Sequence, residues 1–152
     1  MGIIKEGTGT YTITGTNNDI NAGIRLTKGT ISVDNDIEQT KAEKGGGATG
    51  KNGSVIVYED AVLAGIGSIA SATEVYGSIK PGNNATGTLY FTDFQSETSQ
   101  VKVTMHPESN IICQIADTSC YDRLHIDGTV SYSNKTEDFD QSEKMPNITI
   151  EL

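Results

Sequence analysis

A glycine-rich stretch in the first third of the chain has the spacing of a phosphate-binding loop. In GGGATGKN, Gly45 to Asn52, the residues Gly45, Gly50 and Lys51 fall in the required positions. Such a loop needs Ser or Thr after the lysine to hold magnesium, and Asn52 stands there instead. No buried strand precedes the segment and no helix follows it. The sequence therefore favours a mobile glycine-rich loop over a nucleotide site.

Three acidic residues just before that stretch could offer oxygen ligands to a hard cation. Asp34, Asp36 and Glu38 alternate in the segment DNDIE, and Ca²⁺ prefers carboxylate oxygens. An EF-hand would need glycine and glutamate where the chain has Gln39 and Gly45, and the calcium-binding nonapeptide is also absent. The three residues stay as candidate metal ligands, with a solvated acidic turn as the alternative.

The two cysteines and two histidines of the chain are a second set of candidate ligands. Cys113 and Cys120 with His106 and His125 could hold zinc, but a Cys-x₆-Cys pair with flanking histidines is not a known ligand spacing. A Cys–His nucleophile has no further support. A disulfide closing CQIADTSC is one alternative, since the segment can reverse at 116–119, and free buried thiols are another. We predict the disulfide if the protein is extracellular.

Acidic and aromatic residues raise the possibility of polysaccharide chemistry. The chain has 20 acidic residues, so counting alone does not exclude a glycosidase or lyase pair. Such sites gather acids, bases and Arg or Lys in a groove, whereas Arg25 and Arg123 are the only arginines. The aromatic residues that could stack on sugars are Tyr58, Tyr76, Tyr90, Phe91, Phe94, Tyr121 and Tyr132. For those at alternating strand positions we expect core or stacking roles rather than a glycan platform.

Composition narrows the classes of partner. A chain of 152 residues suits one domain, and a formal net charge of −9 disfavours nucleic-acid binding and an anionic membrane surface. No window reaches the roughly 18 apolar residues of a membrane span, and the opening MGIIKEG lacks the pattern of a signal peptide. Strand-like sequence begins directly after Met1. This favours the interpretation that the chain is a piece excised from a longer protein over the interpretation that it is an intracellular protein. No cofactor is expected.

Short strands joined by turns are the main elements that the sequence predicts. Seventeen glycines accompany runs of alternating apolar and polar residues, each about 3–6 residues long. Pro81 and Gly82 predict a β-turn over Lys80 to Asn83. Only Asp36 to Lys44 has a helical pattern, with Asp34 or Asp36 as the N-cap. We interpret 36–53 as a polar, glycine-rich loop insertion at the surface.

A Gly-Thr-apolar unit recurs along the chain. It reads GTYTI at Gly9, GTISV at Gly29, GTLYF at Gly87 and GTVSY at Gly128, and the step from Gly9 to Gly29 is 20 residues. One coil of a parallel β-helix has about that length. An antiparallel β-sandwich is the alternative, although clear hairpin dipeptides are few. We predict dominant parallel ladders around one core that contains Ile13, Leu26, Val33, Val57, Ile79, Leu89, Val103 and Leu124.

Three segments carry a resemblance to a known family. GTGTYTITGTNNDINAGIRLTKGTISVDND (Gly7 to Asp36) resembles the autotransporter-associated β-strand repeat. GSIKPGNNATGTLYF resembles the Pro-Gly-Asn-x-x-Gly-Thr-Leu corner of passenger-type β-helices, and CYDRLHIDGTVSY is similar to the segment downstream of that corner. The resemblance implies one right-handed parallel β-helical domain over 1–152, on a secreted or surface-exposed bacterial protein. The insertion at 36–53 departs from the family pattern.

These observations give three expectations of function. The first is a non-catalytic stalk or scaffold segment of a larger secreted or cell-surface protein, whose secretion signal lies outside this sequence. The second is an accessory carbohydrate-binding module of a polysaccharide-active enzyme. The third is a polysaccharide lyase or hydrolase in its own right. Glycans and other surface proteins are the expected partners, and nucleic acid is not.

Overall fold

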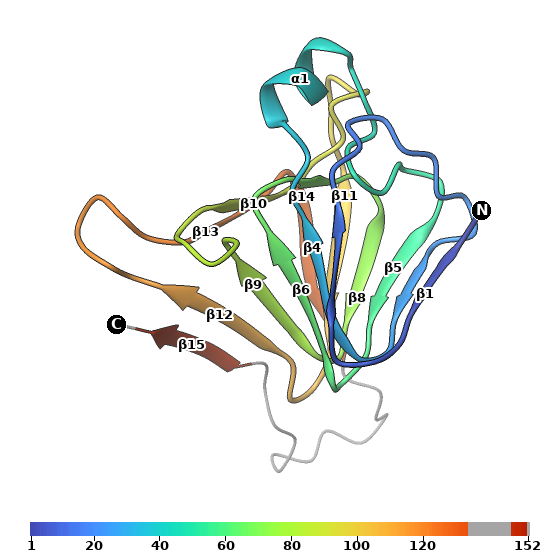
Figure 1. The fold of residues 1–152 in the computed structure, drawn as a ribbon. Helices are drawn as coiled ribbons and strands as arrows, with labels where there is room; N and C mark the ends of the chain where they lie inside the picture. The colour runs from blue at the N-terminus through green and yellow to red at the C-terminus, as the bar shows by residue number, and fades with distance from the viewer. Residues whose placement is uncertain (134–146, 152) are drawn as a thin grey trace.

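Parallel strands in three sheets make up almost all of the regular structure. The computed structural model describes residues 1–133 and 147–151, which form fifteen strands and one helix (Figure 1). The first sheet consists of β1 (Ile3–Lys5), β3 (Ile24–Leu26), β5 (Ser54–Val57), β8 (Ala72–Val75), β11 (Val101–Met105) and β14 (Gly128–Tyr132). The second consists of β7 (Ser68–Ile69), β10 (Thr88–Phe91) and β13 (Arg123–Ile126). The third consists of β2 (Thr10–Ile13), β4 (Gly29–Val33), β6 (Ala61–Gly65), β9 (Ser78–Pro81), β12 (Asn110–Gln114) and β15 (Asn147–Glu151).

The chain visits these sheets in a repeating order. From β5 to β13 it passes three times through the first, third and second sheets in turn. Each return places a new strand beside the previous one, so every ladder between the named strands is parallel. The predicted dominance of parallel ladders is confirmed, and the antiparallel sandwich considered as an alternative is wrong. The arrangement is compatible with a β-solenoid.

One apolar core lies between the sheets. Seven of the eight predicted core residues belong to a single buried cluster, and Leu124 is partly buried against it. The alternation explains this result, because residues at every second strand position face the same side of a sheet. On β4, for example, Ile31 and Val33 are buried inside, while Thr30 faces outward to the lining of a surface groove.

The Pro-Gly corner lies slightly later than predicted. Pro81 is the last residue of β9, and the chain bends at 83–85 rather than over 80–83. Gly82 has a φ of 89° and pairs with Gly65 through two backbone hydrogen bonds of 2.9 and 3.1 Å. Asn84 also has positive φ, at 58°. The strand therefore continues through the proline, and glycine and asparagine take the left-handed conformations that turn the chain.

The single helix lies where a helical pattern was predicted. Helix α1 (Ile37–Ala42) projects beyond the sheets in Figure 1, and the Asp36 side chain caps it by accepting a hydrogen bond from the Gln39 amide at 2.8 Å. Asp36, and not Asp34, is therefore the N-cap. Thr40 is the buried residue of this otherwise polar helix. None of the helical structure in the described ranges is long and apolar enough to cross a membrane.

The glycine-rich stretch after α1 is packed rather than mobile, contrary to expectation. Residues 45–50 are all buried. Gly47, at a φ of 66°, accepts a hydrogen bond from the Asn18 amide at 3.1 Å, and a Cβ on Gly47 would lie 2.5 Å from Ser68 Oγ. The glycines thus let this backbone approach its neighbours closely, which side chains would prevent. The same composition that indicated flexibility indicates close packing here.

Candidate functional site

The phosphate-loop spacing does not form a phosphate site. In such a site the backbone N–H groups of the loop point at the ligand. Here the Gly46 amide donates to Asn17 Oδ1 at 3.2 Å, and the Gly47 amide donates to the Thr16 carbonyl at 3.0 Å. The Gly50 amide donates back to Gly46 at 3.0 Å. These donors are therefore already used within the fold.

The three acidic candidates do not converge on a metal site. The Asp34 carboxylate accepts hydrogen bonds from Ser32 Oγ at 2.9 Å and from Asn83 Nδ2 at 2.6 Å. Asp36 caps α1, and Glu38 forms an ion pair with Lys41 at 2.8 Å on the exposed helix surface. Within the described residues no group of three or more His, Cys, Asp or Glu side chains is placed to hold a metal ion. The three carboxylates are close in the sequence but have different partners in the fold, because Asp36 begins the helix that carries Glu38 while Asp34 lies before it.

The two cysteines are free thiols, so the predicted disulfide is not formed in this structure. The chain does reverse between them, but the register is wrong for a bond. Ile115 pairs with Tyr121, and the Ala116 amide donates to the Cys120 carbonyl at 2.8 Å. Cys113 therefore lies three residues away from the position opposite Cys120. At a strand rise of about 3.3 Å this is about 10 Å, beyond the roughly 7 Å that a disulfide spans.

We expect the native protein to titrate with two free thiols of unequal reactivity. Cys113 is half-buried, and burial together with the nearby Asp122 carboxylate raises the pKa of its thiol, whereas Cys120 is exposed. Since the thiolate is the reactive form, iodoacetamide should modify Cys120 first, and the Cys113 rate should rise at higher pH than is usual for a thiol. Timed alkylation followed by peptide mass spectrometry measures both rates. A single Cys113–Cys120 cross-linked peptide under non-reducing conditions would contradict the register.

Within the part of the chain that the structure describes, the two histidines and two cysteines do not form a zinc site. His106 is buried after β11 and stacks on Tyr76 with ring centroids 3.8 Å apart, and its Nε2 lies 3.3 Å from Glu74 Oε2. His125, on β13, lies 3.1 Å from Asp127 Oδ1. Each imidazole therefore has its own carboxylate neighbour within the fold.

The aromatic candidates mostly contact other side chains of the protein. Tyr58 and Tyr76 lie at corresponding bends of successive coils and stack with ring centroids 6.2 Å apart, and His106 covers Tyr76 further along the same row. Lys41 lies 5.8 Å from the Phe94 ring centroid, and Phe91 is wholly buried in the core. Ring faces used in this way are less available to a sugar, so these residues do not form an open stacking platform.

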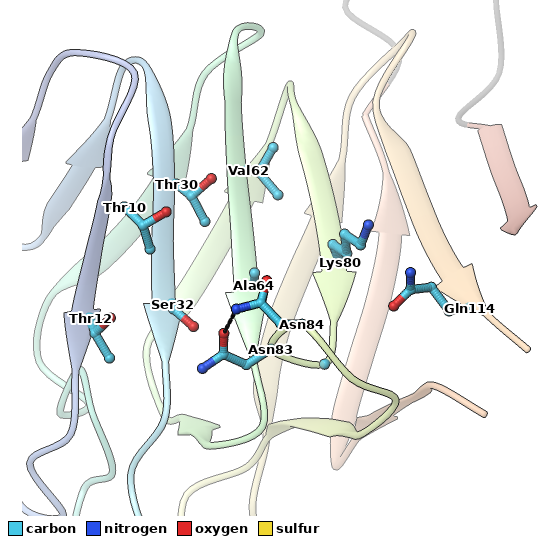
Figure 2. Close-up of a pocket in the computed structure, with 11 residues that line it drawn as sticks. Thr10, Thr12, Thr30, Ser32, Val62, Ala64, Lys80, Asn83, Asn84 and Gln114 are labelled. Carbon is cyan, nitrogen blue, oxygen red and sulfur yellow. Dashed lines mark hydrogen bonds between the residues drawn. The ribbon is translucent and has the colours of Figure 1, made fainter. Parts of the chain in front are cut away.

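A polar groove on the outer face of the third sheet has unused hydrogen-bonding groups. Figure 2 shows side chains from several adjacent strands lining it, and its volume is about 770 Å³. The lining residues are Thr10, Thr12, Thr30, Ser32, Val62, Ala64, Lys80, Gly82, Asn83, Asn84 and Gln114. Strand alternation places the hydroxyls here, because Tyr11, Ile31 and their neighbours occupy the inward positions. The volume suits a small-molecule or oligomeric ligand.

The groove is rich in groups that bind hydroxyl and amide ligands and poor in groups that catalyse. Among the described residues, no protein partner takes up the hydroxyls of Thr10, Thr12 and Thr30, which leaves them available to a ligand. Lys80 is the one ionisable residue in the lining, and it pairs with Glu151 at 3.2 Å. General acid–base catalysis of glycoside cleavage requires two positioned carboxyl groups, and the lining supplies none.

Exposed and half-buried hydrogen bonds hold the rim of the groove in place. Asn83 donates to Asp34, which follows the strand on the far side of β6, and Asp34 in turn accepts from Ser32. Behind the corner, Asp122 is 7% exposed and accepts hydrogen bonds from the Gly87 amide at 2.9 Å and the Gln114 amide at 2.8 Å. One carboxylate thus joins the Pro-Gly corner to β12.

We expect Asp122→Asn to destabilise the protein by about 1–3 kcal/mol, because an amide has one acceptor oxygen and must leave one of the two N–H groups unpaired. Denaturant unfolding measures the loss, and hydrogen exchange at Gly87 and Gln114 should speed up. Asp60→Asn is the matched control at an exposed aspartate and should stay within about 0.5 kcal/mol of the wild type. Equal stability of the two variants would contradict the role assigned to Asp122.

Sequence reasoning missed this groove, although its signal is visible in hindsight. The outward Thr and Ser residues of TYTI and GTISV alternate with the apolar ones that define the core. A scan against protein-family models finds no matching family, and a search of the curated proteins finds no match.

Proposed function

We propose that the chain is a right-handed parallel β-helix that serves as a non-catalytic scaffold or stalk in a secreted or cell-surface protein. The main support is the continuity of the core rows. In the third sheet, Tyr11, Ile31, Leu63, Ile79, Ile111 and Ile148 follow one another in register from the first strand to the last. In a solenoid each coil is stabilised by its neighbours, which gives an extended and rigid element.

The contacts of three carboxylates support the non-catalytic part of the proposal. Asp34 and Asp122 accept hydrogen bonds that join separate parts of the fold, and Asp36 caps α1. These carboxylates therefore have structural roles. The proposed secreted or surface location rests on the resemblance to autotransporter-type repeats, and the net charge of −9 suits a soluble exposed surface.

The test is incubation with a panel of neutral and acidic polysaccharides, with and without calcium. We expect no release of reducing ends and no unsaturated products. The matched control is the same protein after heat denaturation, which sets the background. Reproducible turnover that disappears on replacement of a single carboxylate would refute the proposal.

The groove favours a second candidate, an accessory carbohydrate-binding module. Its unused hydroxyls and the side-chain amide of Gln114 match the hydrogen-bonding needs of a neutral glycan, and the corner that carries Asn83 and Asn84 holds part of its rim in a fixed position. Calorimetric titration with neutral oligosaccharides tests it. The near-isosteric change Thr12→Val should weaken binding about tenfold, whereas Thr129→Val, at an exposed position on the first sheet, should not. Absence of binding to the panel, or equal loss in both variants, would count against this candidate.

A further inference from the structure

The end of the glycine-rich stretch carries a reactive pair of residues that the proposed function does not use. Asn52 is directly followed by Gly53, and this is the single Asn-Gly pair in the sequence. An asparagine side chain can react with the backbone amide of the next residue. Glycine at that next position makes the reaction fastest, because no Cβ shields the amide nitrogen. Whether the pair is free to react depends on the exposure of Asn52 and on the partners of the Gly53 amide.

The fold leaves both reacting groups of this pair available. Asn52 is exposed, and its Nδ2 donates a surface hydrogen bond to Asp19 Oδ1 at 3.2 Å. The half-buried Gly53 lies just before β5, and within the described residues its amide donates no hydrogen bond to backbone or side chain. An amide that is paired with a carbonyl must break that bond before its nitrogen can attack. The Gly53 nitrogen has no such bond to break.

Asn21 provides an internal comparison at the same place on the surface. It is also exposed, and its Nδ2 donates to the other oxygen of Asp19, Oδ2, at 3.2 Å. The residue after it is Ala22, whose amide donates to the Met1 carbonyl at 3.0 Å. The two asparagines therefore share one acceptor residue and are both exposed. They differ in the residue that follows, which has a Cβ and a paired amide after Asn21 and has neither after Asn52.

We propose that Asn52 is a site of spontaneous deamidation through a cyclic imide formed with the Gly53 nitrogen. That nitrogen loses its proton and bonds to Cγ of Asn52, while the Cγ–Nδ2 bond breaks and Nδ2 leaves with the proton as ammonia. Water then opens the imide at either carbonyl. Opening at Cγ gives aspartate with the normal backbone, and opening at the main-chain carbonyl gives isoaspartate. The net change is hydrolysis of an amide to a carboxylic acid and ammonia, with no oxidation or reduction.

Close packing requires glycine at the second position of the pair. A Cβ on Gly53 would lie 2.2 Å from the Ile20 carbonyl oxygen and 2.8 Å from the Gly23 nitrogen. Any larger residue there would force the two backbone segments apart. The missing Cβ that lets these segments approach each other also leaves the Gly53 nitrogen open to the Asn52 side chain. The reactivity of the pair therefore follows from a structural requirement of the fold.

Deamidation loosens the junction between the segment 19–23 and the start of β5. A carboxylate at position 52 cannot donate to Asp19, and it places a second negative charge where a 3.2 Å hydrogen bond now lies. Isoaspartate also adds one carbon to the main chain directly before Gly53, whose backbone packs on Ile20 and Gly23. Because β5 lies between β3 and β8 in the first sheet, this irreversible change reaches the interior of a ladder.

Ageing of the full chain at neutral pH and constant temperature tests the proposal. Peptide mass spectrometry follows both asparagines in one sample, and methylation by an isoaspartyl methyltransferase measures the isoaspartate. Asn52 should convert at least about tenfold faster than Asn21. The rate should rise with pH, because base removes the proton from the attacking amide. Asn52→Gln keeps an amide on a longer side chain and should abolish conversion at this position. Asn21→Gln is the matched control and should leave the conversion of Asn52 unchanged.

The unfolded chain separates the effect of the fold from that of the sequence. In urea the Ala22 amide is released from its carbonyl partner, so the ratio of the Asn52 rate to the Asn21 rate should fall. In the aged folded protein, hydrogen exchange should be faster at 20–23 and in β5 than in fresh protein, and unchanged in β12. The proposal is overturned if Asn52 stays intact in the folded chain while it converts in urea. Equal rates at the two asparagines of the folded chain, or a ratio that urea leaves unchanged, would overturn it as well.

Discussion

Replacing Phe91 with alanine is expected to lower the free energy of unfolding by about 3–5 kcal/mol, which is a large share of the total for a domain of this size. Phe91 is fully buried on β10 and lies in register between Ile69 and Ile126 in the second sheet. Truncation removes its apolar contacts and leaves a cavity, and the flanking coils cannot close it without breaking their ladders. Urea unfolding followed by circular dichroism measures the change.

Phe94→Ala provides the matched control for that experiment. Phe94 is only partly buried, lies outside the apolar core cluster, and has Lys41 over its ring. Its removal should cost less than about 1 kcal/mol. If the two phenylalanine variants lose similar stability, the second sheet is not packed against the core as described.

The fold was largely predictable from the sequence because its signals are local. Inward positions such as Ile31 and Leu89 belong to short alternating runs, and the alternation specifies which face is buried. The glycine of each Gly-Thr unit is the first residue of β4 and β14 and directly precedes β2 and β10, so the repeat predicts these strand starts correctly. Parallel pairing followed from coils of similar length returning to the same sheet.

The site was much less predictable, since it depends on which coils become neighbours. Asp34 and Asn83 are far apart in sequence and meet at 2.6 Å because β4 and β9 both flank β6. Cys113 and Cys120 are close in sequence, yet the register of one short hairpin separates them. Glycine composition also has two opposite physical uses, mobility and close backbone packing, and only the contacts of 45–50 distinguish them.

Asn35→Ala is expected to destabilise the protein by about 2–4 kcal/mol, although it removes only a small polar side chain. Asn35 is 2% exposed and lies between α1 and the second sheet. Its Oδ1 accepts from the Ser68 amide at 2.8 Å, and its Nδ2 donates to Thr40 Oγ1 at 2.8 Å and Ser68 Oγ at 3.0 Å. Alanine leaves the buried Ser68 amide without this acceptor and removes the donor shared by two buried hydroxyls.

The destabilisation by Asn35→Ala should affect the elements around Asn35 before it affects the rest of the fold, which distinguishes it from a general packing defect. Hydrogen exchange should rise first in α1 and at Ser68, because Asn35 connects these two elements, and should rise later in the first sheet. Asn21→Ala is the control, since Asn21 is exposed and its side chain donates to the exposed Asp19 carboxylate at 3.2 Å, and it should change stability by no more than about 0.5 kcal/mol. Uniform loss of protection in all three sheets would show that Asn35 acts through the core rather than as a link between the helix and the second sheet.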